Sequence, residues 1–284
     1  MGSPFIHAGN IIWNSIEGCT RGGRKPNGKI FSFMNKTKIV TLFIQCLVDS
    51  IYPDVGEAMV RIFRQLGIDL TCPTRQTCCG QPAFNSGYRG EARVAARRFI
   101  EIFETAEAIV CPSGSCVTMV RQHYAELFAD DALWFQRAQR IAAKTYELSE
   151  YLVDILEVDD LGAHYNGKIT YHDSCHLLRS LRVKEQPRRL LRNVSGAEFV
   201  ELFDSDRCCG FGGSFSFKYP DISAAMAEDK INNIIASGAD TVVGCDMGCL
   251  MNIQGMLSRK GSGIKTMHIA QILAGEGRQM NIDD

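Results

Sequence analysis

No stretch of this 284-residue chain approaches the roughly 20 consecutive apolar residues that a membrane-spanning helix requires. We therefore expect any membrane association to run through partner proteins. Residues 1–20 lack the basic start and the continuous apolar run of a secretory signal, which predicts a cytoplasmic, reducing compartment. A formal net charge of −1 argues against a broad nucleic-acid-binding surface.

Familiar cofactor motifs are also missing. The sequence shows no nicotinamide fingerprint and no flavin motif, and the glycine-rich run at residues 210–214 lacks the lysine of a phosphate-binding loop. We interpret that run as a turn that wraps a metal cluster. The sequence leaves open where a substrate would bind.

Cysteine, in contrast, is abundant, and ten of the twelve cysteines form two matching sets. Each set has a lone cysteine, then Cys-Cys-Gly, then two further cysteines. The first set is Cys46, Cys78, Cys79, Cys111 and Cys116, and the second set is Cys175, Cys208, Cys209, Cys245 and Cys249. Cys19 and Cys72 fall outside both sets. We expect Cys19 to be incidental and Cys72 to be a packed core thiol.

The two sets are separated by almost constant distances, with 129 residues from Cys46 to Cys175 and 130 from Cys79 to Cys209. The flanking patterns repeat as well, so the sequence predicts an internal duplication of one domain. Each half opens with an apolar, β-branched run and continues with alternating helical and strand patterns. This order predicts an α/β fold of two Rossmann-like halves, each a parallel sheet with cysteine loops at the carboxyl ends of its strands.

The domain organisation predicted from these patterns has four segments. Residues 1–33 are expected to be a poorly ordered N-terminal extension, and the sequence leaves open whether they are translated. Residues 34–133 form the first cysteine-rich domain, 134–160 a helical connector, and 161–284 the second cysteine-rich domain.

The thiols themselves favour a metal centre. A disulfide within each Cys-Cys pair is disfavoured, because adjacent Cα atoms lie about 3.8 Å apart and an unstrained bridge needs roughly 4.4–6.8 Å. Iron–sulfur clusters are held by thiolates, and the glycines beside these cysteines let backbone N–H groups approach inorganic sulfide. Zinc stays an alternative, although its usual closely spaced ligand pairs are missing. A dithiol that exchanges disulfides is a further alternative.

Two histidines flank the lone cysteine of the second set. His172 and His176 could each hydrogen-bond a cluster sulfur, accept a proton coupled to electron transfer, or ligate iron. Simple packing is the alternative for both. No equivalent histidine stands beside Cys46, so a cluster in this chain need not require one.

Two other features have plainer interpretations. His268 follows a predicted strand, and we expect a structural role for it. Arg188, Arg189 and Arg192 form a local basic cluster. We expect these arginines to line a solvated helix face, with docking of an acidic partner as the alternative.

Five passages of the sequence resemble the cysteine-rich CCG-domain family. They are residues 46–49, 78–83, 112–116, 208–213 and 267–270, and the resemblance covers about residues 34–273. The family includes the B subunit of heterodisulfide reductase and the iron–sulfur subunit of glycolate oxidase. The likeness is closest to its lactate utilisation protein A group.

The resemblance implies an iron–sulfur subunit of an L-lactate oxidation system, which passes electrons from the lactate-to-pyruvate step toward the respiratory chain. Its partners would be a ferredoxin-like B protein and a smaller C protein. The implied oxidoreductase does not depend on NAD, and activity of this chain alone is left open. A redox subunit like those of heterodisulfide reductase or glycolate oxidase is one alternative, and a zinc-stabilised scaffold without enzymatic activity is another.

The resemblance also implies the ligands. In heterodisulfide reductase, five cysteines of each motif hold a noncubane [4Fe-4S] cluster, in a motif that ends in C-x2-C. The endings here are C-x4-C and C-x3-C, so the assignment carries over fully only to four cysteines of each set. One or two [4Fe-4S] clusters are therefore expected, held by Cys46, Cys78, Cys79 and Cys116 and by Cys175, Cys208, Cys209 and Cys249, with Cys111 and Cys245 as further candidates.

Overall fold

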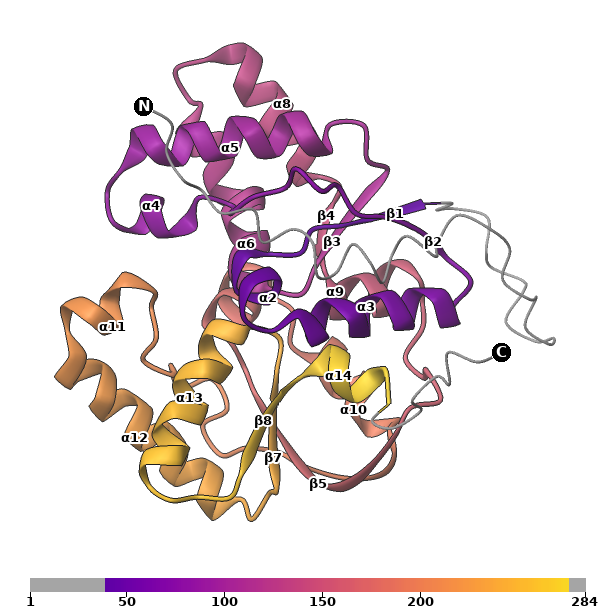
Figure 1. Cartoon of the computed structure of the whole chain (residues 1–284), viewed down its shortest axis with the longest axis vertical. Helices are drawn as coiled ribbons and strands as arrows, with labels where there is room; N and C mark the ends of the chain where they lie inside the picture. Colours follow the sequence, from indigo (N-terminus) through magenta and orange to yellow (C-terminus); the bar gives the residue numbers. More distant parts are fainter. Residues whose placement is uncertain (1–38, 276–284) are drawn as a thin grey trace. The chain divides into compact units, whose positions relative to one another are not determined.

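The computed structural model describes residues 39–275 and divides the chain between Leu148 and Ser149 into two compact units (Figure 1). Each unit contains a four-stranded sheet in which all strand pairs are parallel. The strand order is β2-β1-β3-β4 in the first unit and β6-β5-β7-β8 in the second. The predicted α/β fold with an internal duplication is therefore confirmed. The expected N-terminal extension and Cys19 lie outside the described residues.

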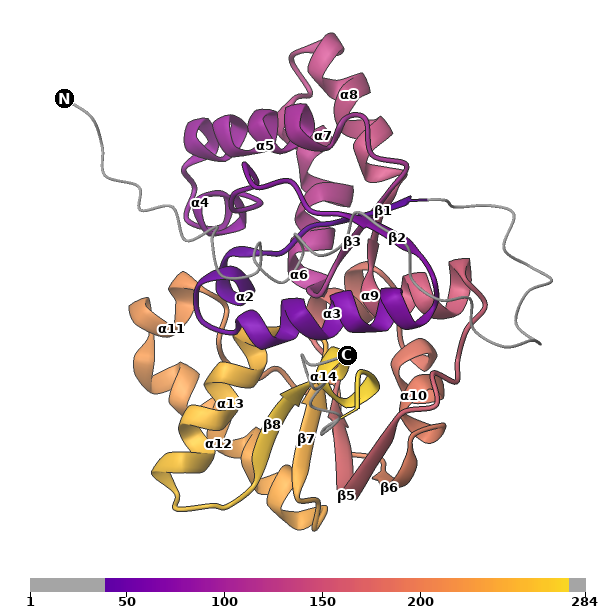
Figure 2. The ribbon, with the colours of Figure 1, turned by 45° about the vertical axis from the view of Figure 1, so that its right-hand side comes forward.

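The first unit builds its sheet from short strands. They are β1 (Ile39–Leu42), β2 (Asp69–Thr71), β3 (Ala108–Cys111) and β4 (Thr145–Glu147). Its helices are α2 (Cys46–Ser50), α3 (Pro53–Gln65), α4 (Gln81–Asn85), α5 (Arg89–Phe103), α6 (Gly114–Thr118), the π-helical turn η2 (Met119–His123), α7 (Tyr124–Leu127) and α8 (Ala132–Ala142). The longest two, α3 and α5, lie on opposite faces of the sheet (Figure 2).

The second unit repeats this arrangement. Its strands are β5 (His164–His172), β6 (Ser195–Val200), β7 (Thr241–Gly244) and β8 (Lys265–His268). Its helices are the π-helical turns η3 (Tyr151–Ile155) and η4 (His176–Ser180), with α10 (Glu185–Arg192), α11 (Ser214–Lys218), α12 (Pro220–Ala236), α13 (Met247–Arg259) and α14 (Ile269–Leu273). The short α9 (Leu148–Glu150) spans the boundary between the units.

Helix α3 shows how the local sequence produces these elements. Pro53 stands in its first turn, where a missing N–H costs nothing and the fixed φ suits a helix. Val55, Met59 and Ile62 recur at helical spacing and are fully buried. Gly67, with a φ of 70°, then turns the chain toward β2, in a backbone region that L-residues with a Cβ rarely adopt.

One hydrophobic cluster of the second unit joins its sheet to α12 and α13. Its buried residues include Leu202, Ile231, Ile234, Val242, Ile253 and Leu257. Among residues 39–275, no helix is long and apolar enough to cross a membrane.

The segment expected to be a helical connector, residues 134–160, is helical only in part. Most of α8 falls within it, but residues 145–147 form β4, which pairs in parallel with β3. A three-residue strand that contains Glu147 has too little apolar periodicity to be recognised from sequence. Its Thr145 is fully buried because it completes the edge of the first sheet.

Candidate metal centres

Both cysteine sets gather beyond the carboxyl ends of their strands. In the first unit, Cys46 begins α2 just after β1, and Cys116 lies in α6 just after β3. The chain crosses from β1 to β2 on one side and from β2 back to β3 on the other. In open α/β sheets this reversal creates the crevice in which ligands bind.

Four sulfur atoms of the first unit form two close pairs. The Sγ atoms of Cys46 and Cys78 lie 3.9 Å apart, and those of Cys79 and Cys116 lie 3.5 Å apart. All four cysteines are free thiols. Cys79 and Cys116 are buried, whereas Cys46 is exposed, so one edge of this sulfur group is open to solvent.

The Cys-Cys-Gly turn requires its glycine. Gly80 and Gly210 have φ angles of 87° and 83°, and the N–H of each lies 3.4 Å from the Sγ of the first cysteine of its turn, Cys78 or Cys208. A Cβ at Gly210 would lie 2.5 Å from the carbonyl oxygen of Ser223. Only glycine fits this close approach, and it leaves an N–H pointing at a ligand sulfur.

The thiols of each set share their protons unequally. Hydrogen bonds from the thiols of Cys46 and Cys79, with help from the N–H of Gly80, hold the pKa of Cys78 far below its usual value. The same contact with Cys78, together with burial, raises the pKa of Cys46. The first cysteine of the Cys-Cys-Gly turn is therefore the thiolate of the metal-free site, and thiolate is the form that binds metal.

The second unit repeats this pattern. Contacts with the thiols of Cys175 and Cys209 lower the pKa of Cys208, while contacts with Cys208 and Cys249 raise the pKa of Cys209. These contacts place the sulfur atoms of all four residues together. Both units thus bring together the same four members of their sets.

Each turn is also fixed from behind by a hydrogen bond to the carbonyl oxygen of its second cysteine. In the first unit the donor is the hydroxyl of the buried Tyr124, at 2.9 Å from Cys79 O. In the second unit it is the side-chain amide of Asn252, at 2.7 Å from Cys209 O. Sequence reasoning missed both residues. They stand at different places after Cys116 and Cys249, so the repeat gave no signal for them.

Cys111 and Cys245, the further candidates, are both fully buried at the ends of β3 and β7. The sulfur of Cys245 accepts a hydrogen bond from the hydroxyl of Tyr171 at 3.3 Å. Tyr171 is itself fully buried and belongs to β5. Cys245 therefore already has a structural partner.

His172 is the histidine that the structure brings to the second sulfur group. One ring nitrogen of His172 and the Sγ atoms of Cys209 and Cys249 all lie within 4.8 Å of one another. The side chain is 1% exposed, and neither ring nitrogen makes a hydrogen bond of good geometry with the described residues, although the backbone of Ser205 lies near enough to raise the pKa of the ring. Burial, reinforced by the charge of Lys230, lowers the pKa of His172 to about 3, so its ring is neutral.

His176 and His268 have other surroundings. His176 is half-buried at the start of η4, with Nδ1 3.7 Å from the Sγ of Cys175. His268 accepts a hydrogen bond from the N–H of Ala270, and Gln271 accepts one from the N–H of His268. These two bonds cap α14, which confirms the structural role expected for His268.

The arginine cluster was predicted wrongly in one respect. Arg188 is not solvated, because it is 3% exposed and donates to both carboxylate oxygens of Asp173 and to Glu201. Arg189 and Arg192 do lie on the surface, paired with Asp159 and Glu185. The sequence of α10 is strongly polar, so it did not indicate that Arg188 faces the buried carboxylate of Asp173.

Cys72 lies just after β2 and is half-buried, outside the four-sulfur group of its unit. Its Sγ accepts a hydrogen bond from the Nε2 of Gln76 at 3.1 Å, and burial raises its pKa to about 11. The Oε1 of the same glutamine accepts the N–H of Ile44. Cys72 is therefore a neutral thiol, and its hydrogen bond with Gln76 helps to hold the loop that leads to Cys78.

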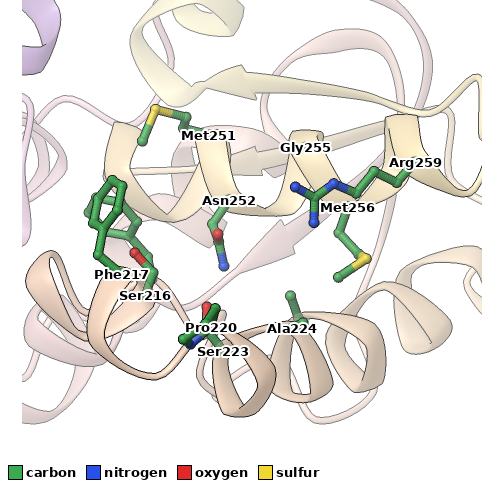
Figure 3. Close-up of a pocket in the computed structure, with 12 residues that line it drawn as sticks. Ser216, Phe217, Pro220, Ser223, Ala224, Met251, Asn252, Gly255, Met256 and Arg259 are labelled. Atoms are coloured by element: carbon green, nitrogen blue, oxygen red, sulfur yellow. The ribbon is translucent and has the colours of Figure 1, made fainter.

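A groove of about 260 Å³ lies behind the second Cys-Cys-Gly turn, between α12 and α13 (Figure 3). Figure 3 shows Asn252 pointing from α13 across the groove toward Ser223 and Pro220 of α12. Ser223 donates to the carbonyl oxygen of Gly210, and Asn252 to that of Cys209. Two polar residues of the groove lining, Ser223 and Asn252, thus hold the turn.

A family model described as the CCG cysteine-rich domain matches the chain twice, over residues 40–121 and 169–254, together more than half of its length. The chain belongs to the CCG cysteine-rich domain family. Each matched segment covers one of the two sulfur groups. A cysteine-rich CCG domain that brings four sulfur atoms together is an arrangement for a metal or an iron–sulfur cluster.

Relatives of high identity carry one name. The lactate utilization protein A of Exiguobacterium sp. is 50% identical over 236 residues, which cover 82% of this chain and 96% of the relative. That of Anoxybacillus flavithermus is 51% identical over 234 residues, which cover 82% of this chain and 98% of the relative. The chain is thus similar to proteins of this name over nearly their whole length.

A solved structure shares the fold. The crystal structure of a hypothetical protein from Helicobacter pylori aligns with a TM-score of 0.54 at 11% identity, over 92% of this chain and 52% of the other. At this identity the likeness supports the arrangement of strands and helices alone.

Proposed function

We propose that this chain is the iron–sulfur subunit of an L-lactate oxidation system, with one cluster held in each CCG domain. The observation that carries the proposal is that both units bring four cysteine sulfurs together at the carboxyl ends of a parallel sheet. The relatives named lactate utilization protein A support lactate as the substrate of the proposal. The proposed partners are a ferredoxin-like B protein and a smaller C protein.

The residues present fit an iron–sulfur cluster. The expected ligands are Cys46, Cys78, Cys79 and Cys116 in the first unit and Cys175, Cys208, Cys209 and Cys249 in the second. An N–H directed at a ligand sulfur, as in the turns of Gly80 and Gly210, stabilises a cluster with delocalised negative charge. A bound iron–sulfur cluster of this kind accepts and donates single electrons.

The protein's own contribution is to hold and shield the ligands. Buried Cys79 and Cys116 keep water from one side of the first site, and exposed Cys46 marks the side on which a redox partner can approach. Oxidation of L-lactate to pyruvate releases two electrons and two protons. In the proposed system the bound clusters would take up these electrons for transfer toward the respiratory chain, and the protons would pass to solvent or to the partner that binds lactate.

Anaerobic purification tests the cofactor. The protein should be brown, absorb broadly near 400 nm, and contain iron and acid-labile sulfide. Cys79→Ala and Cys209→Ala should each remove the iron of one unit, whereas Cys72→Ala should leave the iron content unchanged because Cys72 lies outside the sulfur group. Colourless protein that binds stoichiometric zinc would support the scaffold alternative instead.

Reconstitution tests the reaction. The chain is combined with its B and C partners, and lactate-dependent reduction of an artificial acceptor is measured. We expect activity with L-lactate and its loss when both Cys79 and Cys209 are replaced by alanine. Activity with a heterodisulfide or glycolate, and none with L-lactate, would favour the corresponding alternative reductase or oxidase role.

A further inference from the structure

Two buried positions near the sulfur groups carry different residues in the two units. At the first position, Phe43 follows β1 three residues before Cys46, and His172 ends β5 three residues before Cys175. The second position lies on the helix that packs against the Cys-Cys-Gly turn. A Cβ at Gly80 would meet Ala92 and Ala95, and one at Gly210 would meet Ser223 and Met226.

This correspondence aligns α5 with α12. In the alignment, Phe99 of the first unit is equivalent to Lys230 of the second. Phe43 and Phe99 contact each other edge to face, with ring centroids 4.8 Å apart, and Phe43 also contacts Phe103. At these two positions the first unit therefore has a pair of apolar aromatic side chains. The second unit has an imidazole and an ammonium in the same place.

A buried imidazole without well-formed hydrogen bonds is unfavourable. Native structures rarely contain such a group without a reason. Lys230 does not satisfy the ring, since its Nζ donates to the carbonyl oxygens of Asp204 and Ser205 at 2.9 and 3.0 Å. The first unit has Phe43 and Phe99 at these positions, so the fold itself needs no histidine here.

The atoms around His172 suggest why an imidazole is buried at this position. Its nearest ligand-type atoms are the sulfurs of Cys209 and Cys249, within 4.8 Å. Bonds from a metal to nitrogen or sulfur are about 2.0–2.3 Å long. A metal centre held by Cys209 and Cys249 would therefore lie beside the ring nitrogen of His172.

We propose that His172 binds the metal of the second centre together with Cys209 and Cys249, whereas the first centre has sulfur ligands alone. This inference rests on the proposed iron–sulfur function. A neutral imidazole ligand adds no negative charge, and histidine ligands raise the potential of the iron–sulfur centre in Rieske proteins. The second centre would therefore be the more easily reduced of the two.

Selective isotope labelling tests the ligand directly. The chain is produced with ¹⁵N-histidine or with natural histidine in the background Cys46→Ala/Cys79→Ala, which leaves only the second centre, and also without substitutions. Pulsed EPR is recorded in whichever oxidation state of the centre is paramagnetic. We expect a coupling of the size given by a bonded imidazole nitrogen, and its pattern should change with the histidine label.

Variants assign the signal to one residue. His172→Phe, and His172→Phe/Lys230→Phe, which reproduces the aromatic pair of the first unit, should abolish the coupling and lower the potential of the second centre. His176→Phe is the matched control, because it removes the other histidine near the set and should leave the coupling intact. The double variant avoids leaving Lys230 beside a new apolar side chain.

The possible failures are distinct. An iron-loaded second centre without histidine-dependent coupling in the unsubstituted protein would overturn the role of His172 and leave the proposed function standing. A coupling lost in His176→Phe rather than His172→Phe would also overturn it. Absence of iron and sulfide from the protein would refute the proposed function itself.

Discussion

The guanidinium of Arg188 and the carboxylate of Asp173 form a two-point ion pair, with N–O distances of 3.0 and 2.7 Å. Both side chains are almost fully buried, at 3% and 2% exposure. Asp173 stands two residues before Cys175, so this pair fixes the chain as it leaves β5 for the second cysteine set. The first unit has Ile44 at the corresponding position.

Removing Arg188 should strongly destabilise the second unit. Breaking a buried ion pair from one side leaves an uncompensated charge and costs about 3–5 kcal/mol. Arg188→Leu should lower the free energy of unfolding by that amount, measured by urea denaturation of the metal-free, reduced protein. Arg189→Leu is the control on the same helix. Its pair with Asp159 is exposed and should contribute only about 0–1 kcal/mol, and equal losses in the two variants would contradict the buried role.

The glycine of the second Cys-Cys-Gly turn should not tolerate a side chain. Gly210→Ala places a Cβ 2.5 Å from Ser223 O at a φ of 83°, so the turn must move and Cys208 with it. We expect lower stability and loss of iron from the second unit. Gly255→Ala is the control inside α13, where a Cβ meets nothing within 4 Å. It should stabilise the helix by up to about 1 kcal/mol, and intact iron loading in Gly210→Ala would contradict the requirement.

The fold and the ligand candidates were largely readable from sequence for definite reasons. Buried parallel strands have continuous apolar, β-branched sequences, such as residues 39–44. This pattern can be recognised without any knowledge of the tertiary structure. The duplication shows itself in the cysteine spacing. Because a thiol set repeated in register is typical of a pair of metal sites, the residues that the structure brings together could be named in advance.

The supporting residues could not be named in this way. Arg188 and Lys230 sit on helices among other polar residues, and in sequence a buried cation looks like a solvated one. Lys230 does replace an aromatic of the first half, but this is visible only once α5 and α12 are aligned through their contacts with the glycine turns. Strand β4 was missed because three residues carry no periodicity.

Lys230 should make stability depend on pH. Burial lowers its pKa from 10.5 to about 8, so between these values the unfolded chain binds more protons than the folded one. The contribution of Lys230 to the free energy of unfolding is therefore least favourable below about pH 8. It becomes more favourable as the pH rises from about 8 to 10.5. At about 1.4 kcal/mol per pKa unit, the improvement is at most ~3 kcal/mol.

Lys230→Met removes this dependence. The free energy of unfolding of the unsubstituted protein, minus that of the variant, should increase between about pH 7.5 and 10.5. Urea denaturation of the reduced, metal-free proteins measures it, and the thiols contribute to both proteins. Lys265→Met, at an exposed position of β8, controls for the loss of one positive charge. A difference that stays constant with pH would show that Lys230 is not buried as a cation.

Replacing Cys245 should affect stability rather than cluster binding. Its sulfur accepts a hydrogen bond from the hydroxyl of buried Tyr171, so Cys245→Ala removes this bond at a cost of about 0.5–1.5 kcal/mol. Iron and acid-labile sulfide should stay at the unsubstituted level, in contrast to Cys209→Ala. Cys245→Ser restores an acceptor for Tyr171 and should recover part of the lost stability, which separates a hydrogen-bonding role from a ligand role. If Cys245→Ser instead lost as much iron as Cys209→Ala, the second cluster would have a fifth cysteine ligand.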